Sequence, residues 1–218
     1  VILPFEKDFY KKHQVNAHFV GHPLLDAISD LPEISAENFK KEYGLNDKEI
    51  IALLPGSREQ EVEKMLSLML SVRDSFKNYQ FVIAGAPSLP KEFYQKFVDD
   101  DVHFVSNKTY DLLRCSKAAL VTSGTATLET ALLNVPEIVC YRTSTISYEI
   151  GKRVVKNIKF ISLVNLNMDR EIVKELIQKE LNKENLVTEL QKILEGQKRD
   201  EMLKNYELLR EKLGGKGA

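Results

Sequence analysis

Hydrophobic residues in the central part of the chain form short apolar runs that alternate with longer amphipathic stretches. Most of the short runs are continuously apolar and rich in β-branched residues, as strands buried on both faces of a sheet should be. The opening Val1–Glu6 is an apolar run interrupted by Pro4 and is predicted to be the end of a strand. The other runs predict strands at His18–Gly21, Ile50–Leu54, Gln80–Gly85, Val102–Val105, Ala118–Thr122 and Glu137–Tyr141.

The amphipathic stretches predict helices between these strands. The clearest is Glu59–Phe76, in which apolar residues recur at a spacing of about 3.6 residues. Ala36–Tyr43 is predicted to be a helix with Ser35 as N-cap and Gly44 as C-cap. Because strands and helices alternate, the sequence predicts an α/β fold with a doubly wound parallel sheet. Further helices are predicted at Pro90–Val98, Tyr110–Cys115 and Ala126–Leu133.

The last third of the chain has a different pattern. Helices are predicted at Ile146–Val155 and Glu171–Lys179, on either side of a short apolar piece, Phe160–Val164. Lys183–Glu195 and Arg199–Lys212 are predicted to be highly charged helices with narrow apolar stripes. The glycines that follow predict a flexible end.

Composition and charge exclude several classes of protein. With 31 basic and 32 acidic residues, the net charge of −1 gives no electrostatic case for nucleic acid. No apolar run approaches the ~20 residues that span a bilayer, and the N-terminus lacks the features of a signal peptide. Cys115 and Cys140 lie in apolar segments and are predicted to be reduced, buried thiols, as in a cytoplasmic protein. The chain does not begin with Met, so we expect a piece of a longer protein.

Two loops at the predicted carboxyl ends of strands carry candidate chemistry, because ligands of open parallel sheets bind beyond these ends. The first is Pro55-Gly56-Ser57-Arg58, between a buried strand and a long helix. Gly56 lets the backbone approach a ligand, and Ser57 can cap the helix. The planar guanidinium group of Arg58 can donate paired hydrogen bonds to phosphate oxygens. A capped helix beside a solvated Arg explains the same residues equally well.

The second loop, Ser123–Thr127, opens the following predicted helix. Its three hydroxyl side chains, with Gly124 and the positive end of the helix dipole, favour a diphosphate. Glu129, predicted to lie on the first turn, could accept hydrogen bonds from a ribose diol. An ordinary capped helix would explain Ser123 and Glu129 but not the cluster of small hydroxyl residues, so we favour the diphosphate.

Other ligand motifs are missing from the sequence. No Gly-x-Gly-x-x-Gly follows a strand, which weakens a dinucleotide interpretation, and no P-loop motif is present. Asp99-Asp100-Asp101 is predicted to be a solvated turn rather than a Mg²⁺ site. The four histidines show no metal-ligand spacing and are taken as structural, although a role for His22 in its Gly-His-Pro turn stays open. No metal and no cofactor is therefore predicted.

Short motifs occur in a fixed order along the chain: Val20–Leu24, Leu54–Arg58 with Glu61-Val62, Ser123–Glu129, Tyr141-Arg142, Ser162–Leu166 and Lys174–Gln178. In this order they resemble lipid-A-disaccharide synthase, the glycosyltransferase that joins two acylated glucosamines in lipopolysaccharide assembly. The opening Leu3–Glu6 and the closing Leu213–Gly215 are also similar to family segments, so the resemblance covers nearly the whole chain. Each motif alone is weak, whereas the ordered set is specific.

The resemblance implies one half of a GT-B fold, a Rossmann-like doubly wound parallel sheet with extra C-terminal helices. The family is about twice as long, and only its C-terminal, donor-binding half is matched, so the acceptor-binding domain with the proposed catalytic base is missing. Residues 1-16 would then be a remnant of that domain or a linker, residues 17-182 the UDP-sugar-binding domain, and residues 183-218 the C-terminal helices. The family usually has Leu-Pro-Asn at Leu163-Val164-Asn165, so a fixed φ is lost before Asn165.

The activity implied by the resemblance is transfer of 2,3-diacylglucosamine from UDP to the C6 hydroxyl of 2,3-diacylglucosamine 1-phosphate, with inversion. Arg58 would neutralise charge that develops on the UDP leaving group. Main-chain groups near Phe104–Ser106 would hold uracil, and Asn165 and Gln178 would contact the donor. The remaining implied contacts to the donor are Gly56 and Ser57 in the first loop, Ser123, Gly124 and Thr125 at the diphosphate, and Glu129 at the ribose.

Two other functions stay open. One is another GT-B nucleotide-sugar enzyme, such as a UDP-N-acetylglucosamine 2-epimerase or a peptidoglycan glycosyltransferase, and the other is a non-catalytic interaction module. The resemblance further implies a cytoplasmic protein at the inner face of the inner membrane, with peripheral membrane contact, and a homodimer by C-terminal exchange. The apolar stripe of the last helix would dock on its own domain or on a second chain; it consists of Leu203, Tyr206, Leu209 and Leu213.

Overall fold

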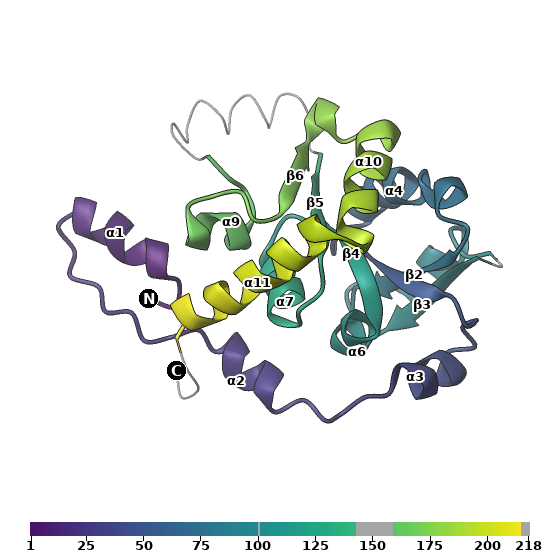
Figure 1. The fold of residues 1–218 in the computed structure, drawn as a ribbon, viewed down its shortest axis with the longest axis horizontal. Coiled ribbons are helices and arrows are strands. Elements are labelled where there is room, and N and C mark those ends of the chain that lie inside the picture. The colour runs from purple at the N-terminus through teal and green to yellow at the C-terminus, as the bar shows by residue number, and fades with distance from the viewer. Residues whose placement is uncertain (100, 143–158, 215–218) are drawn as a thin grey trace.

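A computed structural model describes residues 1–99, 101–142 and 159–214. Six strands form one sheet in the order β3-β2-β1-β4-β5-β6, and every neighbouring pair is parallel (Figure 1). This order is that of a Rossmann-like, doubly wound sheet, so the predicted fold class is confirmed. The strands are β1 (Glu49–Leu54), β2 (Tyr79–Gly85), β3 (Val102–Ser106), β4 (Ser116–Thr122), β5 (Glu137–Tyr141) and β6 (Lys174–Ile177).

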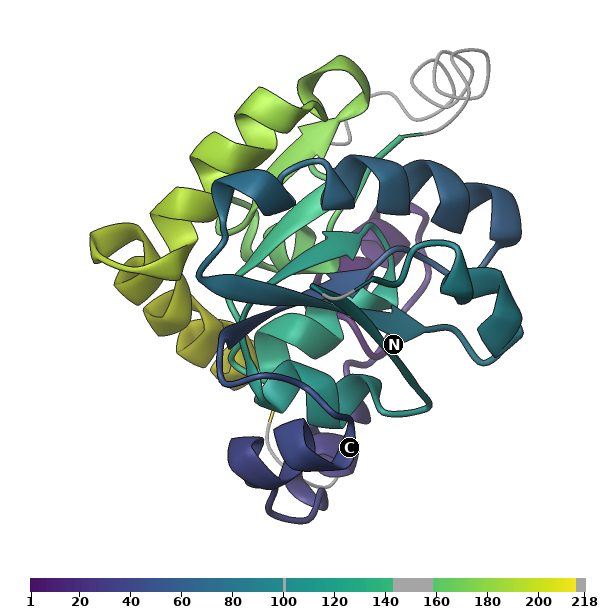
Figure 2. The ribbon, with the colours of Figure 1, turned by 90° about the vertical axis from the view of Figure 1, so that its right-hand side faces the viewer.

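Helices cover both faces of this sheet (Figure 2). The side chains of β1 alternate between two core clusters, with Ile51 and Leu53 in one and Ile50 and Ala52 in the other. Burial on both faces explains why the central strands are continuously apolar in sequence. The first cluster contains side chains of α4 (Glu59–Leu70), α5 (Lys91–Gln95) and α10 (Lys183–Leu194), and the second contains those of α3 (Ala36–Glu42) and α6 (Thr109–Arg114).

The N-terminal prediction of strands is wrong. Residues 1–48 form helices and no strand, namely α1 (Pro4–Lys12), α2 (Leu24–Ser29) and α3. The proline in the opening run stands at the first position of α1, where its fixed φ and missing N–H are tolerated. His18–Gly21 joins no sheet: Val20 N donates to Val1 O, and Gly214 lies close to Phe19 and Gly21.

The predicted helix Glu171–Lys179 is also wrong. Its centre is the edge strand β6, which pairs with β5 and is followed by the short 3₁₀ helix η2 (Gln178–Glu180). The preceding apolar piece runs into α9 (Leu163–Met168), whose N-cap Ser162 accepts a hydrogen bond from Asn165 N. The predicted helix Ile146–Val155 lies outside the described residues.

The C-terminal helices form as predicted, as α10 and α11 (Gln197–Lys212). The apolar stripe of α11 packs on its own domain, where Tyr206, Leu209 and Leu213 are buried. The end of α11 reaches the N-terminal segment (Figure 1), and Leu213 O accepts a hydrogen bond from His22 N at 3.2 Å. His22 itself is buried, and burial lowers the pKa of its imidazole.

A carboxyl group is buried at the start of β5. Glu137 is fully buried, and neither of its carboxyl oxygens has a hydrogen-bond partner among the described residues. Burial, together with the nearby charge of Glu175, raises the pKa of Glu137 well above its ordinary value. Between the ordinary pKa and this raised pKa, the folded protein holds a proton that the unfolded chain has released. Stability therefore falls as the pH rises through this window.

Glu137→Gln is expected to stabilise the protein at neutral pH, because glutamine keeps the shape of the side chain and cannot ionise. The gain should shrink as the pH falls towards about 4.3, the ordinary carboxyl pKa. Melting temperatures between about pH 4 and 8 measure this, at roughly 2–4 °C for each kcal/mol in a chain of this size. The exposed Glu207→Gln is the control and should show no such pH dependence. A gain that is constant over the whole range would contradict the buried-carboxyl argument.

Candidate functional site

A cavity of about 470 Å³ opens at the carboxyl ends of β1, β2 and β4. Ligands of doubly wound folds bind at this edge, near the point where the strand order reverses, here between β1 and β4. The lining is formed mainly by three loops, Gly56–Arg58, Ala84–Pro87 and Thr122–Ala126. The other lining residues are Leu54, Glu61, Thr109 and Glu129.

The cavity brings together most of the predicted site residues, although the two loops that carry them lie far apart in sequence. Asn165 and Gln178 are not among the residues that line it. Phe104–Ser106, the predicted uracil site, does not line the cavity either. Gly85–Pro87 and Thr109 form the cavity wall next to this segment. The predicted residues that do line it are Gly56, Ser57, Arg58, Ser123, Gly124, Thr125 and Glu129.

The loop after β1 is held in place by its backbone conformation and by one neighbour. Gly56 has a φ of +107°, and a Cβ there would lie 2.7 Å from Glu61 Oε2, so the Glu61 side chain packs directly against it. Ser88 Oγ donates to Ser57 O at 2.8 Å, which ties this loop to the loop after β2. Ser57 does not cap α4 as predicted, because the N-cap is Arg58 and no side chain caps this helix.

The loop after β4 opens α7 (Thr125–Leu132). Its N-cap is Gly124, at φ 151° and ψ −163°, and no side chain caps the helix. The hydroxyl of Thr127 is buried and donates to Gly124 O at 2.8 Å, so it is not free for a ligand as predicted. The exposed Thr125 and the uncapped first N–H groups remain at the cavity, an arrangement that suits an anion.

Sequence reasoning missed Thr122, the last residue of β4. Its side chain is nearly buried, and its Oγ1 has no hydrogen-bond partner among the described residues, yet the residue lines the cavity. Buried hydroxyl groups normally have partners, so this orphan points to a bound group. Its signal in the sequence is its place directly before the Ser-Gly-Thr loop, at the predicted end of a strand.

Glu129 lies on the second turn of α7, rather than on the first turn as predicted. It is half-buried, and the hydroxyl of Tyr110 on α6 lies near its carboxylate. Burial raises the pKa of Glu129, and the nearby hydroxyl of Tyr110 opposes this rise. A half-buried carboxylate at the rim of the cavity can accept hydrogen bonds from ligand hydroxyl groups.

The part of the cavity wall next to β2 requires a glycine at position 85. A Cβ at Gly85 would overlap the ring of Phe104 on the neighbouring strand. Phe104 in turn stacks on Tyr94, with ring centroids 4.6 Å apart, and the Tyr94 hydroxyl accepts from Ala86 N at 3.0 Å. These contacts fix the end of β2, and with it one wall of the cavity.

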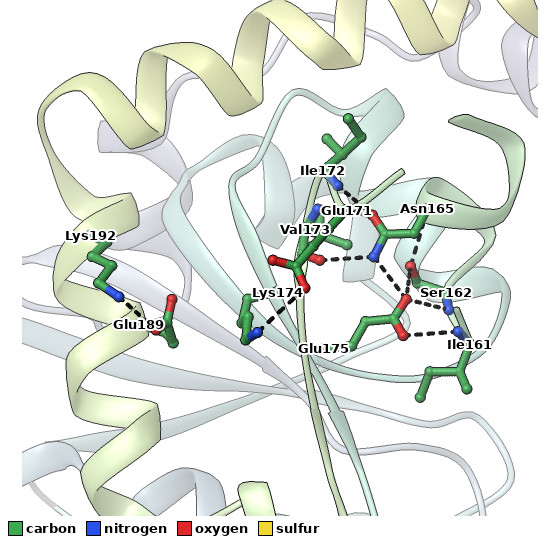
Figure 3. Close-up of polar contacts among 10 residues, drawn as sticks. All are labelled: Ile161, Ser162, Asn165, Glu171, Ile172, Val173, Lys174, Glu175, Glu189 and Lys192. Atoms are coloured by element: carbon green, nitrogen blue, oxygen red, sulfur yellow. Dashed lines mark hydrogen bonds and ion pairs between the residues drawn. The ribbon is translucent and has the colours of Figure 1, made fainter. Parts of the chain in front are cut away.

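Asn165 is completely buried and lies in a hydrogen-bond network away from the cavity lining (Figure 3). Its Nδ2 donates to Val173 O at 2.9 Å and to Glu175 Oε1 at 2.8 Å. Its Oδ1 accepts from Ile172 N at 2.7 Å and from Val173 N at 3.0 Å. Both groups of the side-chain amide are therefore hydrogen-bonded inside the protein. Asn165 has a structural role here, whereas the sequence predicted a contact to the donor.

The same network reaches the cavity indirectly through Glu175. This carboxylate accepts hydrogen bonds from the main chain of Ile161 and Ser162 and from Ser162 Oγ, at 2.7–2.9 Å (Figure 3). Ile161 O accepts a hydrogen bond from Ser123 Oγ at 3.1 Å. The buried carboxylate therefore braces the segment that orients a hydroxyl group at the edge of the cavity.

Gln178 begins η2 with a left-handed φ of 52°. Arg142 donates from Nη2 to Gln178 O at 3.0 Å and to Leu181 O at 2.6 Å, so the Tyr141-Arg142 motif fastens the turn after β6. The structure therefore places Gln178 in a fixed turn outside the cavity lining.

The described residues contain no cluster of three His, Cys, Asp or Glu side chains that could hold a metal ion. In the acidic turn before β3, Asp99 is ion-paired with Arg73 and Asp101 with Lys48, all at exposed positions. Cys115 and Cys140 are free thiols; Cys140 is buried, whereas Cys115 is only half-buried. None of the helices in the described ranges has the length and apolarity needed to cross a membrane.

The fold is shared with solved nucleotide-sugar enzymes. A UDP-GlcNAc 2-epimerase from Methanocaldococcus jannaschii, solved with UDP-GlcNAc and UDP, matches with a TM-score of 0.61 at 12% identity over 91% of this chain and 54% of that one. WaaG, a glycosyltransferase involved in lipopolysaccharide biosynthesis, matches with a TM-score of 0.51 at 16% identity over 97% of this chain and 56% of that one. The chain thus has the Rossmann-like domain of the GT-B class.

Sequence comparison identifies the family within this class. The family model described as lipid-A-disaccharide synthetase matches residues 1–217, and the chain belongs to this family. The lipid-A-disaccharide synthase of Syntrophus aciditrophicus is 38% identical over 100% of this chain and 59% of its own length. That of Aquifex aeolicus is 37% identical over 98% of this chain and 56% of its own length. The chain therefore spans somewhat more than half the length of these relatives.

Proposed function

We propose that this chain is the donor-binding part of an enzyme that transfers 2,3-diacylglucosamine from UDP to the C6 hydroxyl of 2,3-diacylglucosamine 1-phosphate. The observation that carries the proposal is the cavity in which the Arg58 loop meets the uncapped N-terminus of α7. A cation and free N–H groups on the two sides of one cavity suit a diphosphate. Membership of the family supports this choice of donor and acceptor.

Each of the predicted site residues that line the cavity has a role in this proposal. Gly124, Thr125 and the first N–H groups of α7 bind the diphosphate, with Ser123 beside them, and Glu129 binds the ribose. Arg58 is exposed and forms no ion pair with other described residues, so its guanidinium is available to the leaving UDP. Stabilising the negative charge that develops on this leaving group lowers the barrier to transfer. The loop residues Gly56 and Ser57 keep the backbone close to the donor.

The other reaction partners belong to the part of the family's length that this chain does not cover. There we place the acceptor site and the general base that activates the C6 hydroxyl. The isolated chain should then bind UDP and transfer no sugar. We also propose a cytoplasmic enzyme in peripheral contact with the membrane that holds its lipid substrates. A dimer by C-terminal exchange would require the stripe of α11 to leave its own domain, where it is buried.

Titration calorimetry of UDP into this chain tests the proposed site. The chain should bind UDP, and Arg58→Ala and Glu129→Ala should each weaken binding about tenfold, since a hydrogen bond to a charged group is worth about 1.5–3 kcal/mol. Arg170→Ala removes an exposed arginine outside the cavity lining, which donates to Asn205 Oδ1, and should leave the affinity unchanged. Unchanged affinity in both cavity variants would rule the site out.

Competition experiments separate the proposal from its rivals. Acylated UDP-glucosamine should compete with UDP more strongly than the unacylated sugar if the protein acts in lipid A synthesis, whereas an epimerase-like enzyme would favour the unacylated sugar. A non-catalytic interaction module predicts no rise in melting temperature on addition of UDP. A ligand that binds only the folded state must produce such a rise.

A further inference from the structure

We propose that Thr122 is a further residue of the diphosphate site, and that its hydroxyl donates a hydrogen bond to a phosphate oxygen of the bound nucleotide. The inference rests on the proposed function and extends it to a residue outside the motifs that carry the family resemblance. Thr122 is the last residue of β4 and directly precedes the loop that opens α7.

The pleat of the sheet directs this side chain towards the cavity. Along β4, Leu120 belongs to the first core cluster and Val121 to the second. Thr122 continues the alternation and therefore points to the face of the first cluster. Side chains of α4 and α7 are buried in that cluster, so both helices pack on this face. The loops that open these two helices and Thr122 line the same cavity, and the threonine lies at its floor.

The hydroxyl of Thr122 has no partner among the described residues. The residue is 5% exposed, and its neighbour on β5 is Cys140, whose thiol is a weak hydrogen-bonding group. On the other side, Leu54 of β1 lies beside Val121, so the next position belongs to Pro55, which has no polar side-chain group. The free protein thus carries the cost of a buried unpaired hydroxyl, which an acceptor on a ligand would relieve.

The neighbouring hydroxyl groups have already used their protons. Ser123, Thr127 and Thr130 each donate to a main-chain carbonyl oxygen, at 2.7–3.1 Å. A hydroxyl group has one proton to donate, and a carbonyl oxygen can only accept. An ionised diphosphate also presents acceptors alone, so it requires donors from the protein. Thr122 keeps its proton for such a ligand.

A rotation about one bond brings the hydroxyl to the ligand. In the free protein Oγ1 is covered by its surroundings. Rotation about the Cα–Cβ bond moves the hydroxyl between staggered positions and can exchange it with the methyl group. Because Oγ1 has no partner among the described residues, this rotation breaks no hydrogen bond within them. A hydrogen bond to a charged phosphate oxygen is roughly twice as strong as one between neutral groups and favours the rotated position.

A simpler explanation is that Thr122 is a β-branched residue suited to a strand, with a hydroxyl that has no function. That explanation accounts for the burial of the side chain, and it predicts no effect of the hydroxyl on ligand binding. The proposal predicts opposite effects on two quantities when the hydroxyl is removed: the folded protein becomes more stable, and UDP binds more weakly.

The test uses Thr122→Val, which keeps the shape of the side chain and removes the hydroxyl. Without ligand, its melting temperature should rise by about 2–4 °C, because a buried unpaired group is gone. In titration calorimetry, its affinity for UDP should fall about tenfold, the value of one hydrogen bond to a charged group. Thr122→Ser retains the hydroxyl and should bind UDP nearly as tightly as the wild type.

Thr130→Val is the matched control. Thr130 is a buried threonine of α7 whose hydroxyl already donates to Ala126 O at 2.7 Å, and it lies outside the cavity lining. The same substitution there should give no rise in melting temperature and should leave the affinity for UDP unchanged. Phosphorus NMR of bound UDP locates the contact: a phosphate signal should differ between the wild type and Thr122→Val, whereas the uracil proton signals should coincide.

The outcomes are distinct for the two proposals. Failure of the wild type to bind UDP would overturn the proposed function and this inference with it. Unchanged affinity for UDP in Thr122→Val would overturn the role of Thr122 alone. A lower melting temperature in Thr122→Val would show that the hydroxyl has a partner within the protein and would also overturn it. Changes confined to the uracil and ribose signals would refute the contact to the diphosphate.

Discussion

Asn165→Ala is expected to destabilise the folded protein by about 3–5 kcal/mol, even in the absence of any ligand. The substitution would leave two buried main-chain N–H groups, those of Ile172 and Val173, without their acceptor. It would also remove one of the donors that compensate the buried carboxylate of Glu175. Each unpaired buried group costs about 1–3 kcal/mol, and the carboxylate more, so the losses accumulate at one place.

Urea unfolding followed by circular dichroism measures this change in the free energy of unfolding. Asn182→Ala is the matched control: Asn182 caps the exposed start of α10 by accepting from Asn185 N, and its loss should cost only about 1 kcal/mol. The opposite pattern, with Asn165→Ala as stable as the wild type but impaired in UDP binding, would restore the donor contact that the family resemblance implies.

The central sheet could be predicted from the sequence because its strands are buried on both faces. Continuous apolar runs such as Ile50–Leu54 have no amphipathic alternative, so their ends fall within a residue or two of the observed strands. The alternation with amphipathic helices then determines the doubly wound order. From this order the crevice at the carboxyl ends follows directly, and with it the two loops that meet in the cavity.

Two other segments, β6 and the opening of the chain, could not be predicted in the same way. The four residues of β6 contain two buried and two half-buried side chains, and over so short a stretch strand and helix periods look alike. In the opening segment, the apolar residues around Pro4 favoured a strand, although the same proline is well suited to the first position of α1. In both cases tertiary contacts decided the conformation.

The polar contacts that support the cavity could not be predicted from the sequence either. Glu175 lies on the strand predicted as a helix, and its four hydrogen-bond donors come from Ile161, Ser162 and Asn165. Spacing along the chain carries no sign of these contacts, because they form only when separate crossover connections come together at one edge of the sheet.

Gly124→Ala is expected to weaken UDP binding about a hundredfold. Gly124 has φ 151° and ψ −163°, a region that is open essentially to glycine alone and costs other residues about 1–3 kcal/mol. A Cβ at this position would meet nothing within 4 Å, so the penalty comes from the backbone and not from a clash. The loop would relax to another conformation and turn the first N–H groups of α7 away from the diphosphate. The loss of two such contacts to an anion corresponds to the expected change.

Gly44→Ala provides the control, because Gly44 also has a positive φ, of +63°, and a Cβ there would likewise meet nothing within 4 Å, but it follows α3 outside the cavity lining. Both variants should unfold at lower urea concentration than the wild type, since each forces alanine into a strained conformation. Only Gly124→Ala should lose UDP affinity in calorimetry. Equal affinities in the two variants would mean that the N-terminus of α7 does not hold the diphosphate, and the anion would then have to bind at the Arg58 loop alone.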